Sequence, residues 1–340
     1  MNILYGIATT GNGHLSRSKI IVEALKKRGH SVNVILSGRE EKDLFDIDIF
    51  KPFQVKKGFT FAASRGKISY IKTILKSNPL EFLRDINQVN NNYDLVITDF
   101  EPITAYAAKK YKIPCMGIGH QYAFYEDIPM TIKMKFASMF FPKLYAPVNY
   151  TLSFHIDHFN QSILPPFIDP IFYEYSKRSK DDGSILVYLP WENLDDTLKE
   201  LKKIPNNFIL YTNVQSIEKV NNVTLKPFSD KTFKTDLIKA NSLISNAGFQ
   251  LISEALFLGK PILCKAQKNQ PEQEHNAKIL EDLSYATVTK KITSTVIKDW
   301  LNNSKKIKID FPNPIDLVVK IIENKDKDFS KEIKKIWLKK

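Results

Sequence analysis

The stretch from Asn246 to Ala277 constrains the fold of this chain more than any other part of the sequence. An apolar run at 241–245 predicts a strand, and a turn of small residues follows at Ala247-Gly248. A helical pattern over 250–258, a second apolar strand at 261–265 and a polar loop leading into another helix come next. This order predicts a βαβ unit with a binding loop at the carboxyl end of each strand.

The turn at Ala247-Gly248 is suited to an anion. It places backbone N–H groups at the start of a helix, where these donors and the helix dipole favour a phosphate. Glu254 lies one turn further on, and its carboxylate can accept two hydrogen bonds from a vicinal diol such as a ribose. Taken alone, Glu254 is better explained as a favourable acid in a first helical turn. The second loop, with Glu272-Gln273 and Asn276-Ala277, has the spacing of a nucleotide-sugar site and shifts the balance toward ribose binding.

Three segments at fixed spacing carry a family resemblance: Asn246 to Glu254, Gly259 to Pro261, and Glu272-Gln273-x-x-Asn276-Ala277. Together they resemble the donor-binding signature of GT-B glycosyltransferases, in particular the MurG-type enzymes of family 28 and the related UDP-glycosyltransferases. The resemblance implies two doubly wound, Rossmann-like domains that face a central cleft. It also implies a sugar-nucleotide donor in the carboxyl-terminal domain and an acceptor in the amino-terminal one.

The resemblance assigns roles to individual residues of this signature. It implies that the turn meets the donor diphosphate, that Glu254 holds the ribose, and that Glu272 and Gln273 bind sugar hydroxyls. The residues of the turn are Asn246, Ala247, Gly248 and Phe249. Many plant-type relatives carry His at the position of Asn246. An asparagine can still donate to a phosphate oxygen, but it cannot carry charge.

The length and composition of the chain predict its domains and its cellular location. A chain of 340 residues suggests two domains. We expect an acceptor-binding domain over 1–165, a linker over 166–183, a nucleotide-sugar domain over 184–325 and a last helix over 326–340. That helix could pack back on the amino-terminal domain or touch a membrane. The start of the chain lacks the pattern of a signal peptide and no apolar run reaches spanning length, so we expect a cytoplasmic protein, with contact to the cytoplasmic face of a membrane as an option.

The basic charge does not by itself indicate nucleic acid. The formal net charge is +13, but only six of the fifty Lys and Arg residues are Arg. Readers of bases and phosphates rely on bidentate Arg, and the lysines are spread along predicted helix faces. A solvated lysine surface is therefore favoured over a nucleic-acid site. Cys115 and Cys264 fall in or beside predicted buried strands, as expected of structural thiols in a reducing compartment.

A glycine-rich loop follows the first predicted strand, Asn2 to Ala8. Gly11 and Gly13 permit close approach of the backbone, and the helix expected from near Leu15 suits an acceptor phosphate. NAD binding is improbable, because a third glycine and an acid after the next strand are missing. The loop resembles the acceptor-facing loop of MurG-type enzymes. His14 could take a proton from an acceptor hydroxyl, or it could cap or pack beside the helix.

Two later strands deliver further polar residues. The strand at 94–98 leads to Asp99 and Glu101, which could orient His14 or bind an acceptor hydroxyl; Glu101, just before Pro102, could equally cap a helix. The strand at 113–118 leads to His120. MurG-type chains carry a His-containing cluster there, so His120 is a second acceptor-side candidate, with a buried, satisfied histidine as the alternative.

Three further segments carry weaker signals. Residues 130–143 combine Met, Phe and Lys at helical spacing, which fits a core-facing helix or an amphipathic face at a membrane. Pro190-Trp191 stands where MurG-type enzymes have a glycine- and serine-rich loop that helps to hold the diphosphate. The turn at Phe228 is placed by the resemblance beside the nucleotide base.

These observations predict a glycosyltransferase that moves a hexose or N-acetylhexosamine from a UDP-sugar to an acceptor hydroxyl, with inversion. A glycolipid or a cell-envelope intermediate is the expected acceptor. Neither the Asp-x-Asp triplets at 46–48 and 326–328 nor any histidine cluster forms a convincing metal site, so we expect neither a metal nor a cofactor. Two alternatives stay open, a UDP-sugar 2-epimerase and a non-catalytic protein that binds sugar nucleotides.

Overall fold

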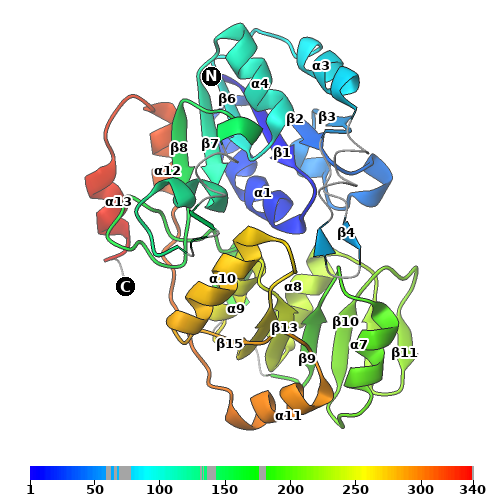
Figure 1. Ribbon diagram of the computed structural model, residues 1–340. Helices are drawn as coiled ribbons and strands as arrows, with labels where there is room; N and C mark the ends of the chain where they lie inside the picture. The colour runs from blue at the N-terminus through cyan, green and yellow to red at the C-terminus, as the bar shows by residue number, and fades with distance from the viewer. Residues whose placement is uncertain are drawn as a thin grey trace. The chain divides into compact units, whose positions relative to one another are not determined.

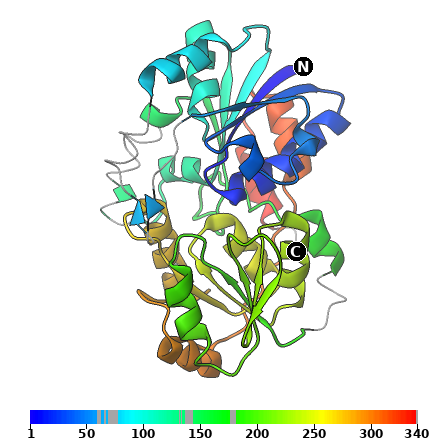
Figure 2. The same ribbon diagram turned by 90° about the vertical axis from the view of Figure 1, so that its right-hand side faces the viewer.

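A computed structural model describes residues 1–58, 63–64, 67–68, 78–130, 132, 134–135, 143–175 and 181–338. The chain divides into two compact units. The first comprises Met1–Ala62, Tyr70–Phe167 and Phe311–Lys340, and the second comprises Ala63–Ser69 and Ile168–Asp310. Figures 1 and 2 show one twisted sheet with helices packed against it in each unit. The predicted fold class of two Rossmann-like α/β domains is confirmed.

The first unit is built on a six-stranded sheet in the order β3-β2-β1-β6-β7-β8. All neighbouring strands in it are parallel. The strands are β1 (Asn2–Ala8), β2 (Ser31–Ser37), β3 (Phe53–Lys56), β6 (Leu95–Asp99), β7 (Cys115–Gly119) and β8 (Tyr150–Ser153). Parallel strands covered on both faces read as continuous apolar runs, and every residue of β6 and β7 is buried.

Helices join these strands and close the core of the first unit. They are α1 (Asn12–Lys27), α3 (Pro79–Asn87), α4 (Pro102–Tyr111), α12 (Ile315–Glu323) and α13 (Ser330–Ile336), with short 3-10 turns at Glu41–Asp43, Asp48–Phe50 and His120–Tyr125. One core cluster joins α3 and α4 to strands β1, β2, β6 and β7, for example through Leu4, Val96 and Ile103. The last helices also belong here, because the Trp337 indole N–H donates to the Ile163 carbonyl at 2.7 Å.

The second unit has a seven-stranded sheet in the order β11-β12-β10-β9-β13-β14-β15. Only β11 is antiparallel to its neighbour in this sheet. The strands are β9 (Ile185–Tyr188), β10 (Phe208–Tyr211), β11 (Glu218–Val220), β12 (Val223–Lys226), β13 (Ser242–Asn246), β14 (Ile262–Lys265) and β15 (Thr287–Val288). A small hairpin, β4 (Ala63–Ser64) and β5 (Lys67–Ile68), stands apart from the sheet.

The helices of the second unit alternate with its strands, as the predicted βαβ pattern requires. They are α6 (Pro170–Tyr175), α7 (Leu194–Leu201), α8 (Asp230–Lys239), α9 (Phe249–Phe257), α10 (Pro271–Asp282) and α11 (Ser294–Asn303). Side chains of α7 and α11 pack on β9, β10 and β12 in one apolar cluster that includes Leu198, Leu210 and Trp300. The βαβ unit of β13, α9 and β14 lies within one residue of the positions expected from the sequence.

The unit boundaries differ from those expected. Apart from the short segment Ala63–Ser69, the chain passes from the first unit to the second at residue 168 and returns at residue 311. The expected linker over 166–183 therefore contributes α6 and two ion-paired carboxylates, Asp169 with Lys234 and Asp181 with Lys260, to the second unit. Residues 311–325, expected in the second domain, cluster with the first.

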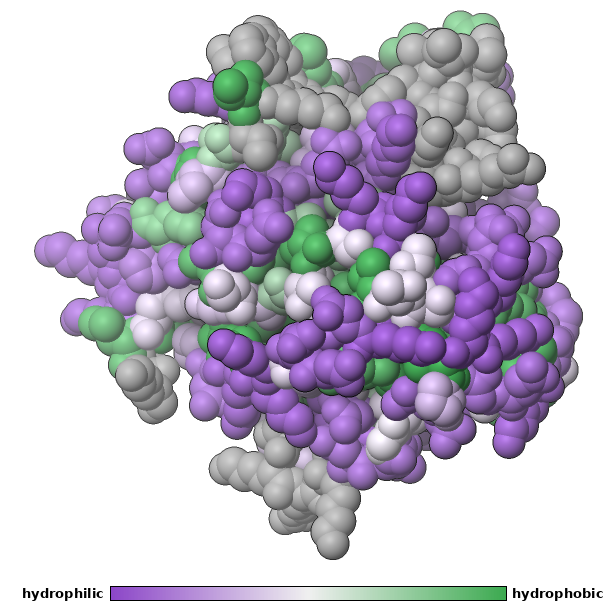
Figure 3. Space-filling model, turned by 60° about the horizontal axis from the view of Figure 1, so that its bottom comes forward, coloured by the Kyte–Doolittle hydropathy of each residue, from purple (hydrophilic) through white to green (hydrophobic). Residues whose placement is uncertain are grey.

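The surface bears on the predicted membrane contact. On the face in Figure 3, hydrophilic residues cover most of the described surface and hydrophobic ones lie in small groups between them. Within 130–143, the positions 131, 133 and 136–142 lie outside the described residues; Met134 is buried and Ile132 is exposed. In the described part of the chain, no helix combines the length and the apolar character that crossing a membrane requires.

Candidate functional site

The predicted site residues gather where each sheet reverses its strand order. In the first sheet the chain turns from β1 toward β2 and β3, and later from β6 toward β7 and β8, so the reversal falls between β1 and β6. In the second sheet it falls between β9 and β13. Open α/β sheets bind ligands at the carboxyl ends of strands at such a point. His14 and Asp99 lie at the first reversal, and Asn246 to Gly248 lie at the second.

His14 belongs to a helix and not to the tip of a loop. α1 begins at Asn12, and Gly11 is its N-cap in an extended conformation, so Gly13 and His14 form the first helical turn. The helix thus starts three residues before the expected Leu15. Residues three and four positions further along a helix share one face, which places Arg17 and Ser18 beside His14.

The carboxylate of Asp99 is the centre of this cluster. Its Oδ1 lies 2.7 Å from His14 Nδ1 and 2.5 Å from Arg17 Nη2. Its Oδ2 accepts from Arg17 Nε at 3.1 Å and from the Ser18 hydroxyl at 3.0 Å. Asp99 is fully buried, which by itself raises its pKa, but the charges and hydrogen bonds of Arg17 and His14 outweigh burial and lower the pKa below its ordinary value. Asp99 is therefore ionised at neutral pH.

This arrangement fixes the chemistry of the His14 ring. When Nδ1 donates to Asp99, the neutral ring carries its proton on Nδ1 and offers Nε2 as an acceptor. The His14 side chain is 15% exposed. No hydrogen bond joins Nε2 to any residue in the described ranges. Asp99 can stabilise the imidazolium formed when Nε2 takes a proton, while Arg17 Nη2, 3.2 Å from Nδ1, opposes that charge. The cluster can therefore act as a general base through Nε2 of His14.

Glu101 lies at the start of α4 and serves as its cap. Oε1 accepts from the Ser37 hydroxyl and the Ile103 N–H, and Oε2 accepts from the Thr104 N–H and hydroxyl, all at 2.7 to 2.8 Å. Burial raises the pKa of Glu101, although these hydrogen bonds lower it in part. The side chain is fully buried and both oxygens are engaged. The geometry therefore favours the cap over the catalytic role that the sequence also allowed.

The geometry of His120 matches the second of the two interpretations of the sequence, a buried histidine whose hydrogen bond is satisfied. Its Nδ1 lies 3.0 Å from the Phe154 carbonyl and can donate to it, and the side chain is 1% exposed. The rings of Phe124 and His155 lie 5.0 Å from the His120 ring. A buried histidine that is hydrogen-bonded to the backbone cannot reach a substrate without rearrangement, so this geometry gives it no direct acceptor role.

The turn after β13 is held from two sides. The Lys265 carbonyl accepts from the Ala247 N–H and from the Asn246 side-chain amide, both at 3.2 Å. The Asn276 amide donates to the Ala247 carbonyl at 3.1 Å. Asn246 Oδ1 is buried and has no hydrogen-bond partner among the described residues. One amide hydrogen of Asn246 is thus used to shape the turn, which limits the donor function expected of this side chain.

Gly248 is the N-cap of α9, and no side chain caps this helix. Apart from its two chain neighbours, no described residue has an atom within 4 Å of a Cβ added at Gly248. Phe249 begins the helix and is largely buried. The backbone at Gly248 therefore borders open space at a helix N-terminus, as the predicted phosphate contact requires.

The candidate ribose and sugar residues lie on the two flanking helices. Glu254 is 5% exposed, accepts from Gln250 Nε2 at 2.7 Å, and follows the first turn of α9, which contains no acid. A first-turn interaction with the helix dipole is therefore excluded as the reason for Glu254. Glu272 lies in the first turn of α10 and is half-buried. Gln273 Oε1 accepts from the Gln267 N–H at 2.9 Å and so braces the loop before α10.

Phe228 lies in an aromatic group between β12 and α8. Its ring meets Tyr188 edge-on with centroids 6.1 Å apart, and Phe233 packs against both Tyr188 and Tyr211. Beneath these rings, Asp236 accepts from Tyr211 at 2.7 Å and pairs with Lys226 at 2.6 Å. The half-buried position of Phe228 leaves part of its ring able to contact a ligand.

Sequence reasoning missed four charged or polar members of these sites: Arg17, Ser18, Glu192 and Lys265. Arg17 and Ser18 had a usable signal, because they follow His14 at helical spacing. Glu192 lies in the loop after β9, and its Oε1 lies 2.6 Å from Lys265 Nζ at the end of β14. No local sequence pattern predicts this pair, since Glu192 follows β9 and Lys265 ends β14, and these two strands are not neighbours in the sheet.

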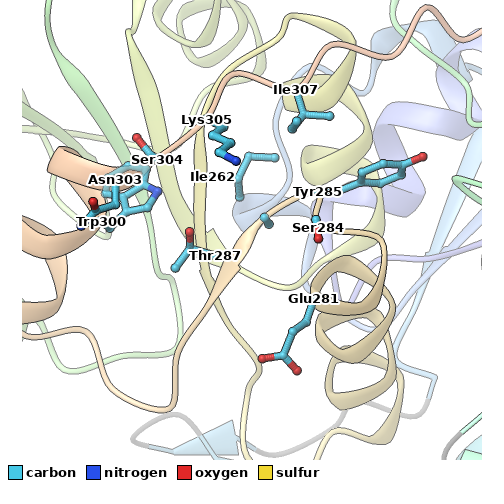
Figure 4. A pocket seen from close by; sticks show the side chains of 11 residues that line it. Ile262, Glu281, Ser284, Tyr285, Thr287, Trp300, Asn303, Ser304, Lys305 and Ile307 are labelled. Atoms are coloured by element: carbon cyan, nitrogen blue, oxygen red, sulfur yellow. The ribbon is translucent and has the colours of Figure 1, made fainter.

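A pocket of the second unit, shown in Figure 4, lies away from these residues. It is bordered by the first residues of β14 and β15 and by the ends of α10 and α11. It therefore opens at the amino edge of the sheet, opposite the turn at Gly248. Its lining consists of Ile262, Glu281, Ser284, Tyr285, Ala286, Thr287, Trp300, Asn303, Ser304, Lys305 and Ile307. In the part of the chain that is described, no group of three His, Cys, Asp or Glu side chains is placed to hold a metal ion.

Comparison with known proteins bears on these geometries. The family described as Glycosyl transferase family 1 matches residues 1–304. An uncharacterized glycosyltransferase of Methanosarcina mazei is 24% identical over 323 residues, which cover 84% of this chain and 85% of the relative. MurG of Acinetobacter baumannii and LpCGTa in complex with UDP each cover 88% of this chain and 89% of their own, with TM-scores of 0.52 and 0.56 and identities of 16% and 12%. At these identities the structural likeness shows the shared GT-B fold.

Proposed function

Because the chain belongs to glycosyl transferase family 1, we propose that it moves a hexose or N-acetylhexosamine from a UDP-sugar to an acceptor hydroxyl. Glycosyl transfer as such follows from the family and from the relative in Methanosarcina. The UDP donor, the acceptor, the inverting course and the independence of metal are the proposed part. The observation that carries the proposal is the hydrogen bond of 2.7 Å between His14 and Asp99.

His14 is the proposed base. Its Nε2 takes the proton of the acceptor hydroxyl as that oxygen forms a bond to the anomeric carbon. The bond from the anomeric carbon to the diphosphate oxygen breaks with its electron pair, and UDP leaves. Attack opposite the leaving group inverts the anomeric centre. Asp99 keeps its negative charge and holds the imidazolium in place, as a buried, ionised carboxylate can.

The turn at Asn246 to Gly248 is the proposed diphosphate site, and Glu254 is the proposed ribose ligand. The turn lies at the carboxyl edge of the second sheet, where its strand order reverses, and Glu254 lies on the helix that follows it. The complex of LpCGTa with UDP supports UDP as the first donor to test. Backbone donors at the turn would meet the charge that develops on the diphosphate, so the proposed reaction needs no metal. Turnover should persist in EDTA.

A direct experiment tests the donor site. A panel of UDP-, dTDP- and GDP-sugars is screened by thermal shift, and the best nucleotide is titrated against Glu254→Ala. We expect UDP to raise the melting temperature of the parent protein and the variant to lose that increase. Glu218→Ala, on the exposed strand β11, is the matched control. A variant that is stabilised as strongly as the parent would contradict the ribose role of Glu254.

The acceptor is proposed to be a glycolipid or a prenyl-linked envelope intermediate, met at the cytoplasmic face of a membrane. The amphipathic pattern of residues 130–143 supports this choice. Release of UDP is measured with lipid-linked and with water-soluble acceptors presented in parallel. Transfer to soluble acceptors alone would contradict the lipid proposal. Conversion of UDP-N-acetylglucosamine without any acceptor would indicate a 2-epimerase.

A further inference from the structure

An ion pair crosses the end of β13 in the second unit. Glu192 lies in the loop after β9, and Lys265 is the last residue of β14. Because β13 lies between these two strands, the 2.6 Å contact between Glu192 and Lys265 bridges over the carboxyl end of β13. The Lys265 ammonium group is therefore held beside the turn that begins at Asn246.

Lys265 is also connected to the turn through its backbone. In the parallel register Lys265 is the partner of Asn246, and its carbonyl accepts from Asn246 and from Ala247. A shift of Lys265 would therefore move the turn as well. The same residue fixes the shape of the turn through its carbonyl and pairs with Glu192 through its charged side chain.

The expected donor residues lack a positive charge. They contain two carboxylates, Glu254 and Glu272, but no Lys or Arg. A nucleoside diphosphate is an anion, and its charge grows on the phosphate side as the glycosidic bond breaks. Backbone donors at a helix N-terminus supply only a partial charge. The described residues of the second unit include no arginine, so among these residues lysine is the side chain that carries a full positive charge at neutral pH.

We propose that Lys265 is the cation that binds the donor diphosphate, and that Glu192 holds it above the turn until the donor arrives. This inference rests on the proposed function and deepens it. The side chains of Lys265 and Glu192 are 18% and 19% exposed, so an anion can reach the ammonium group without unfolding the loop. Binding exchanges the Glu192 carboxylate for a phosphate oxygen. Lys265 thereby takes over a contact that Pro190-Trp191 does not provide.

The alternative is that the pair only braces the loop after β9. The two accounts predict opposite signs for one variant. If Glu192 competes with the diphosphate, Glu192→Gln should bind UDP more tightly, by about two- to fivefold, since partly exposed pairs contribute little. If the pair is a brace, the same variant should bind UDP more weakly, because the loop and the turn lose their support.

The experiment measures the affinity of UDP and of uridine by calorimetry for the parent chain and for four variants, which include Glu192→Gln. Lys265→Gln should weaken UDP binding by about tenfold or more and leave uridine binding within about twofold, since only UDP carries the diphosphate. Lys203→Gln is the matched control, because Lys203 pairs with Glu200 at the same 2.6 Å beyond the end of α7. The double variant Lys265→Gln/Glu192→Gln should not show the tighter UDP binding that is expected of Glu192→Gln alone.

The possible outcomes separate this inference from the function on which it rests. If the parent binds UDP and Lys265→Gln binds it equally well, the role of Lys265 is refuted and the donor site stands. If Lys265→Gln weakens the binding of UDP and of uridine to the same extent, the lysine is only structural and the inference fails. If the parent binds none of UDP, dTDP and GDP, both the inference and the proposed donor fail.

Discussion

The two candidate sites occupy the same place in two similar sheets, yet they are built in different ways. In the first unit, Asp99 is fully buried and receives hydrogen bonds from three side chains, those of His14, Arg17 and Ser18. In the second unit, the turn at Gly248 has no side-chain cap and borders open space. The first site is assembled before any ligand binds, whereas the second leaves polar backbone for a ligand to meet.

This difference fits the two tasks. A base must keep one ring orientation and one tautomer until it accepts the proton, which requires fixed partners around the imidazole. A diphosphate brings its own charge and acceptor oxygens, so its site needs donors and room. Substitutions in the first unit should therefore affect turnover or folding strongly, while those at the Gly248 turn should affect binding and leave the fold intact.

The largest effect is expected at His14. His14→Ala removes the proposed base, and turnover should fall by about 10²- to 10⁴-fold, while the affinity for UDP stays unchanged. UDP release and calorimetry measure the two quantities. His158→Ala, a second histidine of the first unit, is the control and should keep its activity. Turnover that survives in His14→Ala would assign the proton transfer to another group, Asp99 first.

Asp99→Asn should impair both activity and folding. It leaves the Arg17 guanidinium buried without its counter-charge, which should cost about 3–5 kcal/mol of the free energy of unfolding. The lowered pKa of Asp99 means that its charge stabilises the fold above about pH 4 and that this stabilisation is lost as the pH falls through the folded pKa. Urea unfolding between about pH 3 and pH 7 should show this acid loss in the parent and a flatter profile in the variant.

Glu101→Gln sharpens the contrast within the first unit. The cap of α4 would lose acceptor sites, so the free energy of unfolding should fall by about 1–3 kcal/mol. Turnover of the folded fraction should not change, because the buried Glu101 carboxylate is engaged by Ser37, Ile103 and Thr104 and so serves the cap of α4. A fall in turnover beyond the loss of folded protein would restore Glu101 as a catalytic candidate.

The smallest effect is expected at the turn of the second unit. Gly248 has a φ of −78°, which alanine adopts readily, and its added Cβ meets nothing. The free energy of unfolding of Gly248→Ala should therefore lie within about 0.5 kcal/mol of that of the parent. The variant should bind UDP a few-fold more weakly, because the methyl group would occupy the proposed phosphate space. Gly6→Ala should instead destabilise the fold, since its Cβ would lie 2.0 Å from Thr104 Oγ1 and clash with it. Equal UDP affinity in Gly248→Ala would place the diphosphate elsewhere.

Much of the fold could be predicted because its strands and helices depend on patterns of residues that are close together in the sequence. Apolar runs of strand length followed by helical periods identified β13, α9 and β14 within one residue, and the same reasoning placed β1 and β6. The boundaries were less predictable. α1 starts at Asn12 because Gly11 adopts the extended N-cap conformation, a choice between neighbouring small residues that periodicity does not resolve.

The sequence by itself determined the two α/β halves, the family and the position of the turn at Asn246 to Gly248, since each depends on residues close together in the chain. The tertiary structure decided which distant side chains meet. His14 and Asp99 are 85 positions apart, and Glu192 reaches Lys265 only because β13 lies between β9 and β14. Strand order creates these contacts, and a local pattern of hydrophobic residues carries no information about strand order.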